Sequence, residues 1–231
     1  GFLNYDLKSL RYLTQAGGKL SISLQKILAE YANQKNIKFY IMYGQTEATA
    51  RIAYLPPELA DKKYESIGVM IPGGKGYLVD SENHPIDSVG EEGELVFESP
   101  SVMLGYAQCR RDLSRGDDMH GVLHTGDIMR QDEDRCFYVV GRKKRFIKLY
   151  GMRISLDEVE RILKDKFVGE AFACTGNDEC IHVYFEEERI ADEVLEFLMR
   201  VLKIDRKVIY FHNIEKLPRN PSGKVIYSEL L

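Results

Sequence analysis

Short apolar segments separated by turn-forming residues fill positions 66–140, and this pattern limits the middle of the chain to short strands. The clearest segments are Tyr77–Asp80, Glu94–Glu98 (ELVFE) and Cys136–Val140 (CFYVV). Glycine, proline, asparagine and aspartate occupy the gaps between them, as tight turns require. Such a succession predicts a small β-barrel or a distorted sheet.

The residues before about position 65 follow an α/β pattern instead. Leu10–Ala16 (LRYLTQA) predicts a short strand that runs into two glycines. Ser21–Asn33 places its apolar residues on one helical face, and Ser21 or Ser23 is a suitable N-cap. Phe39–Tyr43 predicts the strand that follows this helix.

The composition changes again after Gly141. Ser155–Lys166 (SLDEVERILKDK) predicts an amphipathic helix, with Ser155 three residues before Glu158 in the spacing of a capping box. The remaining predicted elements are strands at Ala171–Cys174, Ile181–Phe185 and Val208–Phe211 and a helix at Ile190–Leu202. We therefore expect two domains, 1–143 and 144–231, of which the second is a compact α+β unit.

Charge and hydropathy exclude some classes of protein. The 231-residue chain has 32 basic and 36 acidic residues, a net charge of −4, whereas sequence-independent nucleic-acid binding needs a basic surface. No apolar run approaches the roughly 18 residues of a membrane span. No secretory signal stands at the start, so we expect a cytoplasmic protein without a membrane span or a nucleic-acid partner.

The four cysteines form no CxxC pair and no Cys/His finger pattern. Cys174, Cys180 and His182 lie close enough in sequence to raise the question of a metal site. The favoured interpretation is two strand residues and a turn thiol in a reducing compartment.

A strand ends in the segment Tyr43–Glu47 (YGQTE), and its residue types suit a phosphate site. Gly44 lets the backbone approach a ligand closely. The hydroxyl of Thr46 and the carboxylate of Glu47 suit a phosphate oxygen and a hard cation such as Mg²⁺. A solvated turn with Thr46 as N-cap explains the same residues about as well.

Two further segments carry polar chemistry. In His124–Asp127 (HTGD), an aspartate just after a tight glycine turn can accept both hydroxyls of a ribose, although an Asp that caps a β-turn is the simpler reading. In Pro218–Lys224 (PRNPSGK), two prolines and a glycine restrict a loop that presents one lysine, or the loop is an ordinary surface turn.

Residues Gly141–Arg153 (GRKKRFIKLYGMR) place six basic side chains within thirteen positions. A basic run is usually a solvated surface or a linker. The interleaved Phe146, Ile147, Leu149 and Tyr150 predict partial burial of this one.

Taken in order, these segments resemble the adenylate-forming superfamily, which contains acyl-CoA synthetases, luciferases and nonribosomal peptide synthetase adenylation domains. The resemblance spans about Ala16 to Tyr227. It rests on YGQTEAT, GELVFESPSVMLGY, HTGD, GRKKRFIKLYGMRI with LDEVE, and PRNPSGK. It implies an α/β and β-barrel-like end of the large adenylating domain, followed by a small, mobile α+β C-terminal domain.

The resemblance also implies a reaction and its participants. The family makes an acyl-adenylate from a small carboxylic acid and ATP with Mg²⁺, then transfers the acyl group to CoA or to the phosphopantetheine of an acyl or peptidyl carrier protein. By similarity, Lys224, Thr46 and Glu47 are catalytic, and Glu47 is the Mg²⁺ carboxylate. The residues matched to the nucleotide or to the acceptor side are Gly17, Gly18, Tyr43, Gly44, Asp127, Arg142, Lys144 and Lys148.

Single matches carry specific roles within that set. Tyr43 matches the aromatic residue that stacks on adenine, and Asp127 matches the ribose-binding aspartate. Lys144 occupies the hinge position about which the C-terminal domain rotates between the two half-reactions. Lys148 and Gly151 match a segment that approaches the active site for thioester formation.

The sequence also departs from the family pattern. Arg145 stands where an acidic residue is common, and Asp134–Arg135 replaces a common Asp-Gly turn. The phosphate loop that grips the β- and γ-phosphates is not in these residues, and the chain begins at Gly1 rather than Met. We therefore expect part of a longer ligase that is inactive alone. The alternative is a non-catalytic fragment that binds a nucleotide or a carrier protein.

Overall fold

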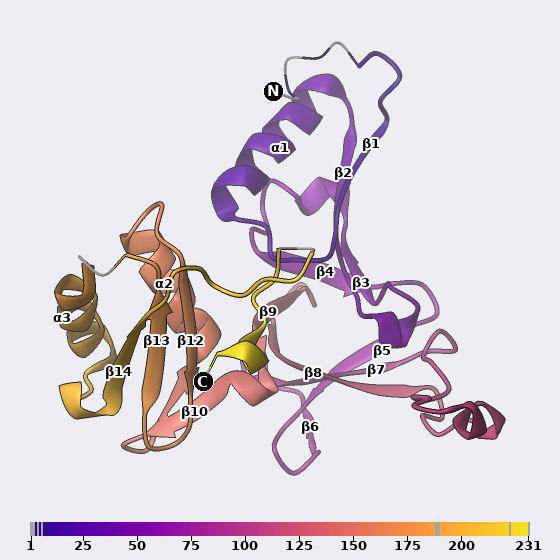
Figure 1. The fold of residues 1–231 in the computed structure, drawn as a ribbon. Helices are drawn as coiled ribbons and strands as arrows, with labels where there is room; N and C mark the ends of the chain where they lie inside the picture. The colour runs from indigo at the N-terminus through magenta and orange to yellow at the C-terminus, as the bar shows by residue number, and fades with distance from the viewer. Residues whose placement is uncertain (1–2, 4, 6, 188–189, 222, 231) are drawn as a thin grey trace. The chain divides into compact units, whose positions relative to one another are not determined.

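The computed structural model describes residues 3, 5, 7–187, 190–221 and 223–230. Its ribbon is shown in Figure 1. The chain divides into two compact units, Gly1–Val140 and Gly141–Leu231. Ser222, which belongs to the predicted PRNPSGK loop, lies outside the described residues. Within the described part of the chain, no helix is both long and apolar enough to cross a lipid bilayer.

The first unit is built on a nine-stranded sheet in the order β1-β2-β3-β4-β9-β8-β7-β5-β6. The strands are β1 (Tyr12–Gln15), β2 (Lys38–Tyr43), β3 (Ala53–Leu55), β4 (Ser66–Met70), β5 (Lys75–Val79), β6 (Pro85–Ile86), β7 (Glu92–Glu98), β8 (Val122–Gln131) and β9 (Phe137–Arg142). The predicted barrel is not seen. Its edge strands, β1 and β6, lie at opposite ends of the order, and no pairing among the described strands joins them. Since β6 has only two residues, it offers little backbone to pair.

A helix joins the two parallel strands at one edge of this sheet. Helix α1 (Ile22–Lys35) connects β1 to β2, as the predicted strand–helix–strand pattern requires. Ser21 is the N-cap, and its hydroxyl accepts a hydrogen bond from the Leu24 N–H at 3.3 Å. Asn36 ends the helix in the left-handed conformation. The apolar cluster between α1 and the sheet includes Phe39, from β2.

Short 3₁₀ turns connect several strands of the first unit. They are η2 (Thr46–Ala48), η3 (Pro57–Leu59) and η4 (Arg110–Ser114). The β-rich part surrounds its own apolar cluster, in which Leu95, Phe97 and Met129 are fully buried. The short predicted strands near β5, β7 and β9 are confirmed, whereas β3, β4, β6 and β8 were not predicted.

The second unit combines a hairpin, a three-stranded sheet and two helices. Its elements are η5 (Lys143–Arg145), β10 (Phe146–Leu149), β11 (Met152–Ser155), α2 (Leu156–Lys166), β12 (Phe172–Gly176), β13 (Ile181–Phe185), α3 (Ala191–Leu202), η7 (Arg206–Val208), β14 (Ile209–Asn213) and η8 (Tyr227–Glu229). Ser155 caps α2 by accepting from the Glu158 N–H at 3.3 Å, as predicted. The basic run was expected as a partly buried segment, and it forms η5 and the β10–β11 hairpin.

Alternation along β12 and β13 separates two faces of the small sheet. Phe172 and Val183 belong to the cluster that contains the buried residues of α2 and α3. Ala173 and Tyr184 point the other way and pack with Leu217 in a second cluster. The helices therefore cover one face, and the C-terminal segment after β14 covers the other.

Candidate functional site

The loop after β2 returns on itself within a few residues. The Ile52 N–H donates to the Tyr43 carbonyl at 2.9 Å, and the Ala50 N–H donates to the Gln45 carbonyl at 3.0 Å. A Cβ on Gly44 would lie 2.2 Å from the Ala50 carbonyl oxygen. The chain's own backbone therefore lies against Gly44 on the side that a Cβ would occupy.

Asp127 lies in the middle of β8 at a bulge. The register pairs Val96 with His124 and Glu94 with Ile128, so Thr125–Asp127 face the single residue Leu95. Gly126 adopts φ +69°, and the Thr125 hydroxyl donates to the Leu95 carbonyl at 2.8 Å. The prediction of a tight turn before Asp127 was wrong. A β-bulge redirects the strand and re-aims its side chains without ending it.

The two segments meet through Tyr43, Gln45 and Asp127. The Tyr43 hydroxyl donates to the Asp127 carboxylate. The Gln45 amide nitrogen lies 3.0 Å from the same carboxylate oxygen, 2.8 Å from the Thr125 carbonyl oxygen and 3.2 Å from the Tyr43 hydroxyl. Asp127 is only 2% exposed. A buried carboxylate needs such donors, because burial without them carries a large desolvation cost.

The protonation of Tyr43 follows from its surroundings. Burial raises the pKa of its phenol well above the usual range, and the negative charge of Asp127 raises this pKa further. The phenol therefore stays protonated and donates to the carboxylate at physiological pH. The result is an aromatic ring fixed beside a buried anion.

Glu47 stands on the 3₁₀ turn that follows this cluster. Its carboxylate accepts from the Tyr106 hydroxyl at 2.7 Å, and its carbonyl accepts from the Met103 N–H at 2.8 Å. The bond to Glu47 raises the pKa of the Tyr106 phenol. Thr46, on the same turn, is exposed.

The donor set around Glu47 is too small to hold a metal ion with protein ligands alone. Among the described residues, no group of three or more His, Cys, Asp or Glu side chains could hold a metal ion. Mg²⁺ commonly takes one or two protein carboxylates and completes its octahedron with water and substrate phosphates. Glu47 fits that pattern, with a nucleotide supplying the other oxygens.

Gly17 and Gly18 lie in the exposed loop after β1. Gly17 has φ +89°, and the Gly18 carbonyl accepts from the Gln15 side-chain amide at 2.6 Å. Apart from the glycine itself and its two chain neighbours, no heavy atom of the described structure lies within 4 Å of a Cβ built on either position. Both positions therefore leave open space around the loop.

Lys224 lies in the second unit on a short hairpin. Arg219 and Val225 form a bridge, and the Asn220 N–H donates to the Lys224 carbonyl at 2.9 Å. The Asn220 side chain accepts from the Lys224 N–H at 3.0 Å, while Gly223 has φ +81°. The predicted restrained loop is thus a closed turn that carries an exposed lysine.

The three other predicted basic residues begin the second unit. Arg142 ends β9, and its N–H donates to the Asp157 carboxylate at 3.0 Å. Lys144 is exposed on η5, and Lys148 is exposed on β10. A hollow of about 460 Å³ is lined by Lys144, Phe146, Ile147, Gly176, Asn177, Asp178 and Glu179.

Several of these contacts were not predicted from the sequence. Gln45 joins Tyr43 to Asp127, Tyr106 holds Glu47, and Glu94 accepts from the Gly126 N–H at 3.0 Å. The interpretation of the YGQTE segment assigned no role to Gln45. Its partner stands 82 positions away, which no local pattern reports.

Comparisons with known sequences agree on one group of enzymes. A family model described as "AMP-binding enzyme" matches residues 2–107. The 4-coumarate–CoA ligase-like 2 protein of Arabidopsis thaliana is 28% identical over 235 residues, which cover 98% of this chain and 41% of that protein. The long-chain-fatty-acid–CoA ligase of Salmonella typhimurium is 30% identical over 241 residues, which cover 99% of this chain and 41% of the ligase. The chain thus spans about two fifths of the length of these relatives.

Solved structures show the same fold. The O-succinylbenzoate coenzyme A synthetase of Bacillus subtilis, in complex with AMP, superposes with a TM-score of 0.73 at 24% identity and covers 98% of this chain and 47% of that one. A structure of the same synthetase with ATP and a magnesium ion superposes with a TM-score of 0.66 at 23% identity, over 95% of this chain and 46% of that one.

Proposed function

The chain belongs to the adenylate-forming superfamily, and from this premise we propose that it is part of an AMP-forming acid–thiol ligase. The whole enzyme activates a carboxylic acid as an acyl-adenylate and transfers the acyl group to a thiol. In the first half-reaction the carboxylate attacks the α-phosphorus of ATP and pyrophosphate leaves. In the second, the thiol attacks the acyl carbonyl and AMP leaves.

One observation carries the nucleotide side of this proposal: Tyr43 and Gln45 converge on the buried carboxylate of Asp127. An aromatic face suits adenine stacking, and a carboxylate accepts hydrogen bonds from two ribose hydroxyls. When a nucleoside binds, its hydroxyls add to or replace the bonds from Tyr43 and Gln45, so the anion stays paired. Thr46 and Glu47 follow on the next turn, where the phosphates would lie.

In this proposal, the metal ion and Lys224 both stabilise the negative charge of the phosphates. Mg²⁺, when bound with the nucleotide through Glu47, neutralises phosphate charge. Lys224 supplies a compact cation where the carboxylate and the α-phosphate meet, and this contact strengthens as charge moves onto the phosphoryl oxygens. We assign adenylation to Lys224 and expect thioester formation to be independent of it.

The division of labour follows the two units. We propose that residues 1–143 end the nucleotide-binding domain and that residues 144–231 form a mobile C-terminal domain with its hinge at Lys144. Rotation at such a hinge lets one site serve two reactions. The acceptor is CoA or a carrier-protein phosphopantetheine, and the names of the relatives favour CoA. Arg142 and Lys148 are proposed contacts for the nucleotide and the thiol substrate, respectively.

The test uses the full-length parent enzyme with ATP, Mg²⁺ and a panel of aryl, fatty and amino acids. ATP–pyrophosphate exchange with at least one acid is the expected result. Lys224→Ala is expected to lower exchange about 100-fold or more, while thioester formation from a supplied acyl-adenylate is retained. The exposed Lys216→Ala is the matched control and should leave both reactions unchanged.

Other outcomes would redirect the assignment. Nucleotide binding without exchange for any acid would favour the alternative, a non-catalytic binding protein. Equal loss of both half-reactions in Lys224→Ala would refute the role given to that lysine. The 231-residue chain by itself is expected to show no exchange.

A further inference from the structure

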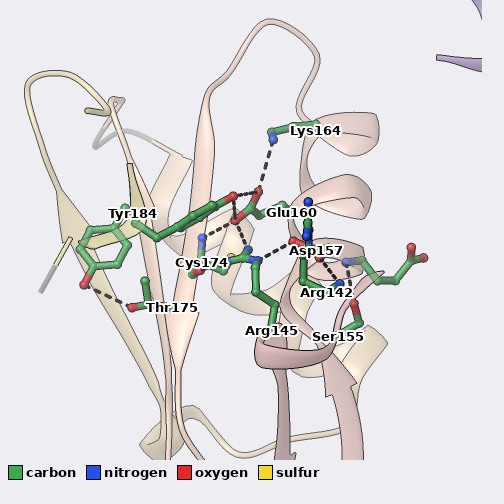
Figure 2. A network of polar contacts seen from close by, with 11 residues as sticks. Arg142, Arg145, Ser155, Asp157, Glu160, Lys164, Cys174, Thr175 and Tyr184 are labelled. Carbon is green, nitrogen blue, oxygen red and sulfur yellow. Dashed lines mark hydrogen bonds and ion pairs between the residues drawn. The ribbon is translucent and has the colours of Figure 1, made fainter. Parts of the chain in front are cut away.

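Arg145 is a buried cation held between two carboxylates. Its side chain is 14% exposed, its Nε donates to Asp157 at 2.5 Å, and its Nη2 donates to Glu160 at 2.6 Å. Its Nη1 donates to the Cys174 carbonyl at 3.0 Å. Figure 2 shows the guanidinium between the two carboxylates of α2. All three guanidinium nitrogens are therefore used, which fixes the plane of the group.

Tyr227 attaches the C-terminal segment to this ion pair. The Arg145 guanidinium carbon lies 3.8 Å from the centre of the Tyr227 ring, within the range of a cation–π contact. The Tyr227 hydroxyl lies 3.0 Å from both oxygens of Glu160. Burial, together with the charge of Glu160, raises the pKa of this phenol, so it remains a donor.

Glu160 joins four parts of the second unit. Glu160 is 6% exposed, and its carboxylate also accepts a hydrogen bond from the Cys174 N–H at 2.8 Å. The Lys164 Nζ lies 3.5 Å from the Glu160 Oε2. Its partners thus come from η5, α2, β12 and η8. A buried network with every member paired holds its parts in one arrangement, because removal of Arg145 takes the nearest cation from the buried Glu160 carboxylate.

The lysine hairpin continues directly into this network. The Ile226 N–H donates to the Pro218 carbonyl at 2.9 Å, and the Arg219–Val225 bridge closes the strands next to it. Tyr227 is the next residue, three positions after Lys224. At the other end, Arg145 directly follows Lys144, the proposed hinge.

We infer that Arg145 is a positioning residue for Lys224: through Glu160 and Tyr227 it fastens the lysine hairpin to the turn that follows the hinge. The inference rests on the proposed function. Because Arg145 is fixed, backbone rotation is confined to the residues before it, and the hairpin turns as one body with η5. Loss of the network disorients Lys224 and therefore slows adenylation, while thioester formation, which does not use Lys224, continues.

The experiment compares Arg145→Lys and Tyr227→Phe with Arg161→Lys in the full-length parent. Arg161 is the matched control, because it also bridges two carboxylates of α2, Glu158 and Asp165, but its side chain is exposed whereas that of Arg145 is buried. For Arg145→Lys we expect pyrophosphate exchange to fall about 10- to 100-fold. Its KM for ATP and its rate of thioester formation should stay within about twofold. Tyr227→Phe should show a smaller loss of the same kind, and Arg161→Lys none.

Two further measurements decide between positioning and general stability. In a Lys224→Ala background, Arg145→Lys should reduce exchange no further, since its effect passes through Lys224; a full additional loss would overturn the inference. Amide hydrogen exchange of the chain should speed up at residues 218–227 in Arg145→Lys but not in Arg161→Lys. Unchanged protection there would also overturn it. The hydrogen-exchange measurement does not depend on catalysis. Failure of the proposed function, in which no acid supports pyrophosphate exchange, can therefore be told apart from failure of the positioning role of Arg145.

Discussion

Replacing Gly44 by alanine is expected to destabilise the first unit by about 2 kcal/mol. The added Cβ would lie 2.2 Å from the Ala50 carbonyl oxygen, 2.6 Å from its carbonyl carbon and 2.8 Å from the Arg51 Cα. These are backbone atoms, so no side chain can rotate away. Relief requires the loop after β2 to open by about 1 Å to restore ordinary van der Waals contact.

The magnitude follows from what that opening breaks. Overpacking of this kind costs about 1–3 kcal/mol. Loss of one loop hydrogen bond, such as Ala50 to Gln45, adds about 0.5–1.5 kcal/mol. Alanine also restricts the unfolded chain, which offsets about 0.4–1 kcal/mol. These contributions combine to a net loss of stability of about 0.5–4 kcal/mol, with a central value of about 2 kcal/mol.

The assay is urea unfolding of the chain by far-UV circular dichroism, because the chain has no tryptophan to report by fluorescence. Hydrogen exchange of peptides over residues 38–55 assigns the change to the first unit. Gly18→Ala is the matched control, since its Cβ meets nothing within 4 Å in the described structure and its φ is not positive. It should leave stability unchanged or raise it by up to about 1 kcal/mol.

Equal shifts of the urea midpoint in Gly44→Ala and Gly18→Ala would refute this prediction. Retained protection of the 38–55 peptides, with loss of protection in the rest of the sheet, would refute it as well. In that case, the loop after β2 would adapt to a side chain at little cost.

Three other predictions concern affinity, packing and pH. In the parent enzyme, Asp127→Asn should weaken ATP binding by calorimetry about 10-fold or more, since a charge-assisted acceptor is lost; unchanged affinity would contradict the site. Leu163→Ala, at a fully buried position, should lower the free energy of unfolding of the second unit by about 2–5 kcal/mol, as measured in urea. Leu113→Ala, at a position 75% exposed, should lower the free energy of unfolding by less than about 0.5 kcal/mol. Burial first, and then nearby His182, lower the folded-state pKa of His212. The stability that this neutral histidine contributes is therefore fully present above its unfolded-state pKa of about 6.5 and is lost as the pH falls through the lower folded-state pKa. In His212→Gln, the urea midpoint should depend less steeply on pH between pH 8 and 5. An equal pH dependence of the midpoint in both proteins would refute this.

Local signals in the sequence were sufficient for the helices and several strands. Ser155 caps α2 through a residue three positions away, and the apolar segment Ile181–Phe185 is β13 itself. The cap and the strand are both determined by residues close together in the sequence. Strand β8 has no such signal, because the bulge at Thr125–Asp127 interrupts the alternation by which a strand is recognised.

The site was predictable in its residue types but not in its connections. Tyr43 and Asp127 were chosen from separate segments, yet their direct bond depends on the path of a sheet whose order places three strands between β2 and β8. Arg145 belongs to a basic run for which partial burial was predicted, but its partners were not. Its burial depends on Asp157 and Glu160, which come from a helix formed later in the chain.

The burial of Arg145 also changes what the basic segment offers to an anion in solution. Five of the seven residues Arg142–Lys148 are basic, but Arg145 is largely withdrawn from solvent and neutralised by carboxylates. The exposed cations are Arg142, Lys143, Lys144 and Lys148. Because salt screens exposed charges far more than buried pairs, any attraction of this segment for an anion should depend on the exposed cations and weaken with ionic strength, whereas the Arg145 ion pairs should change little.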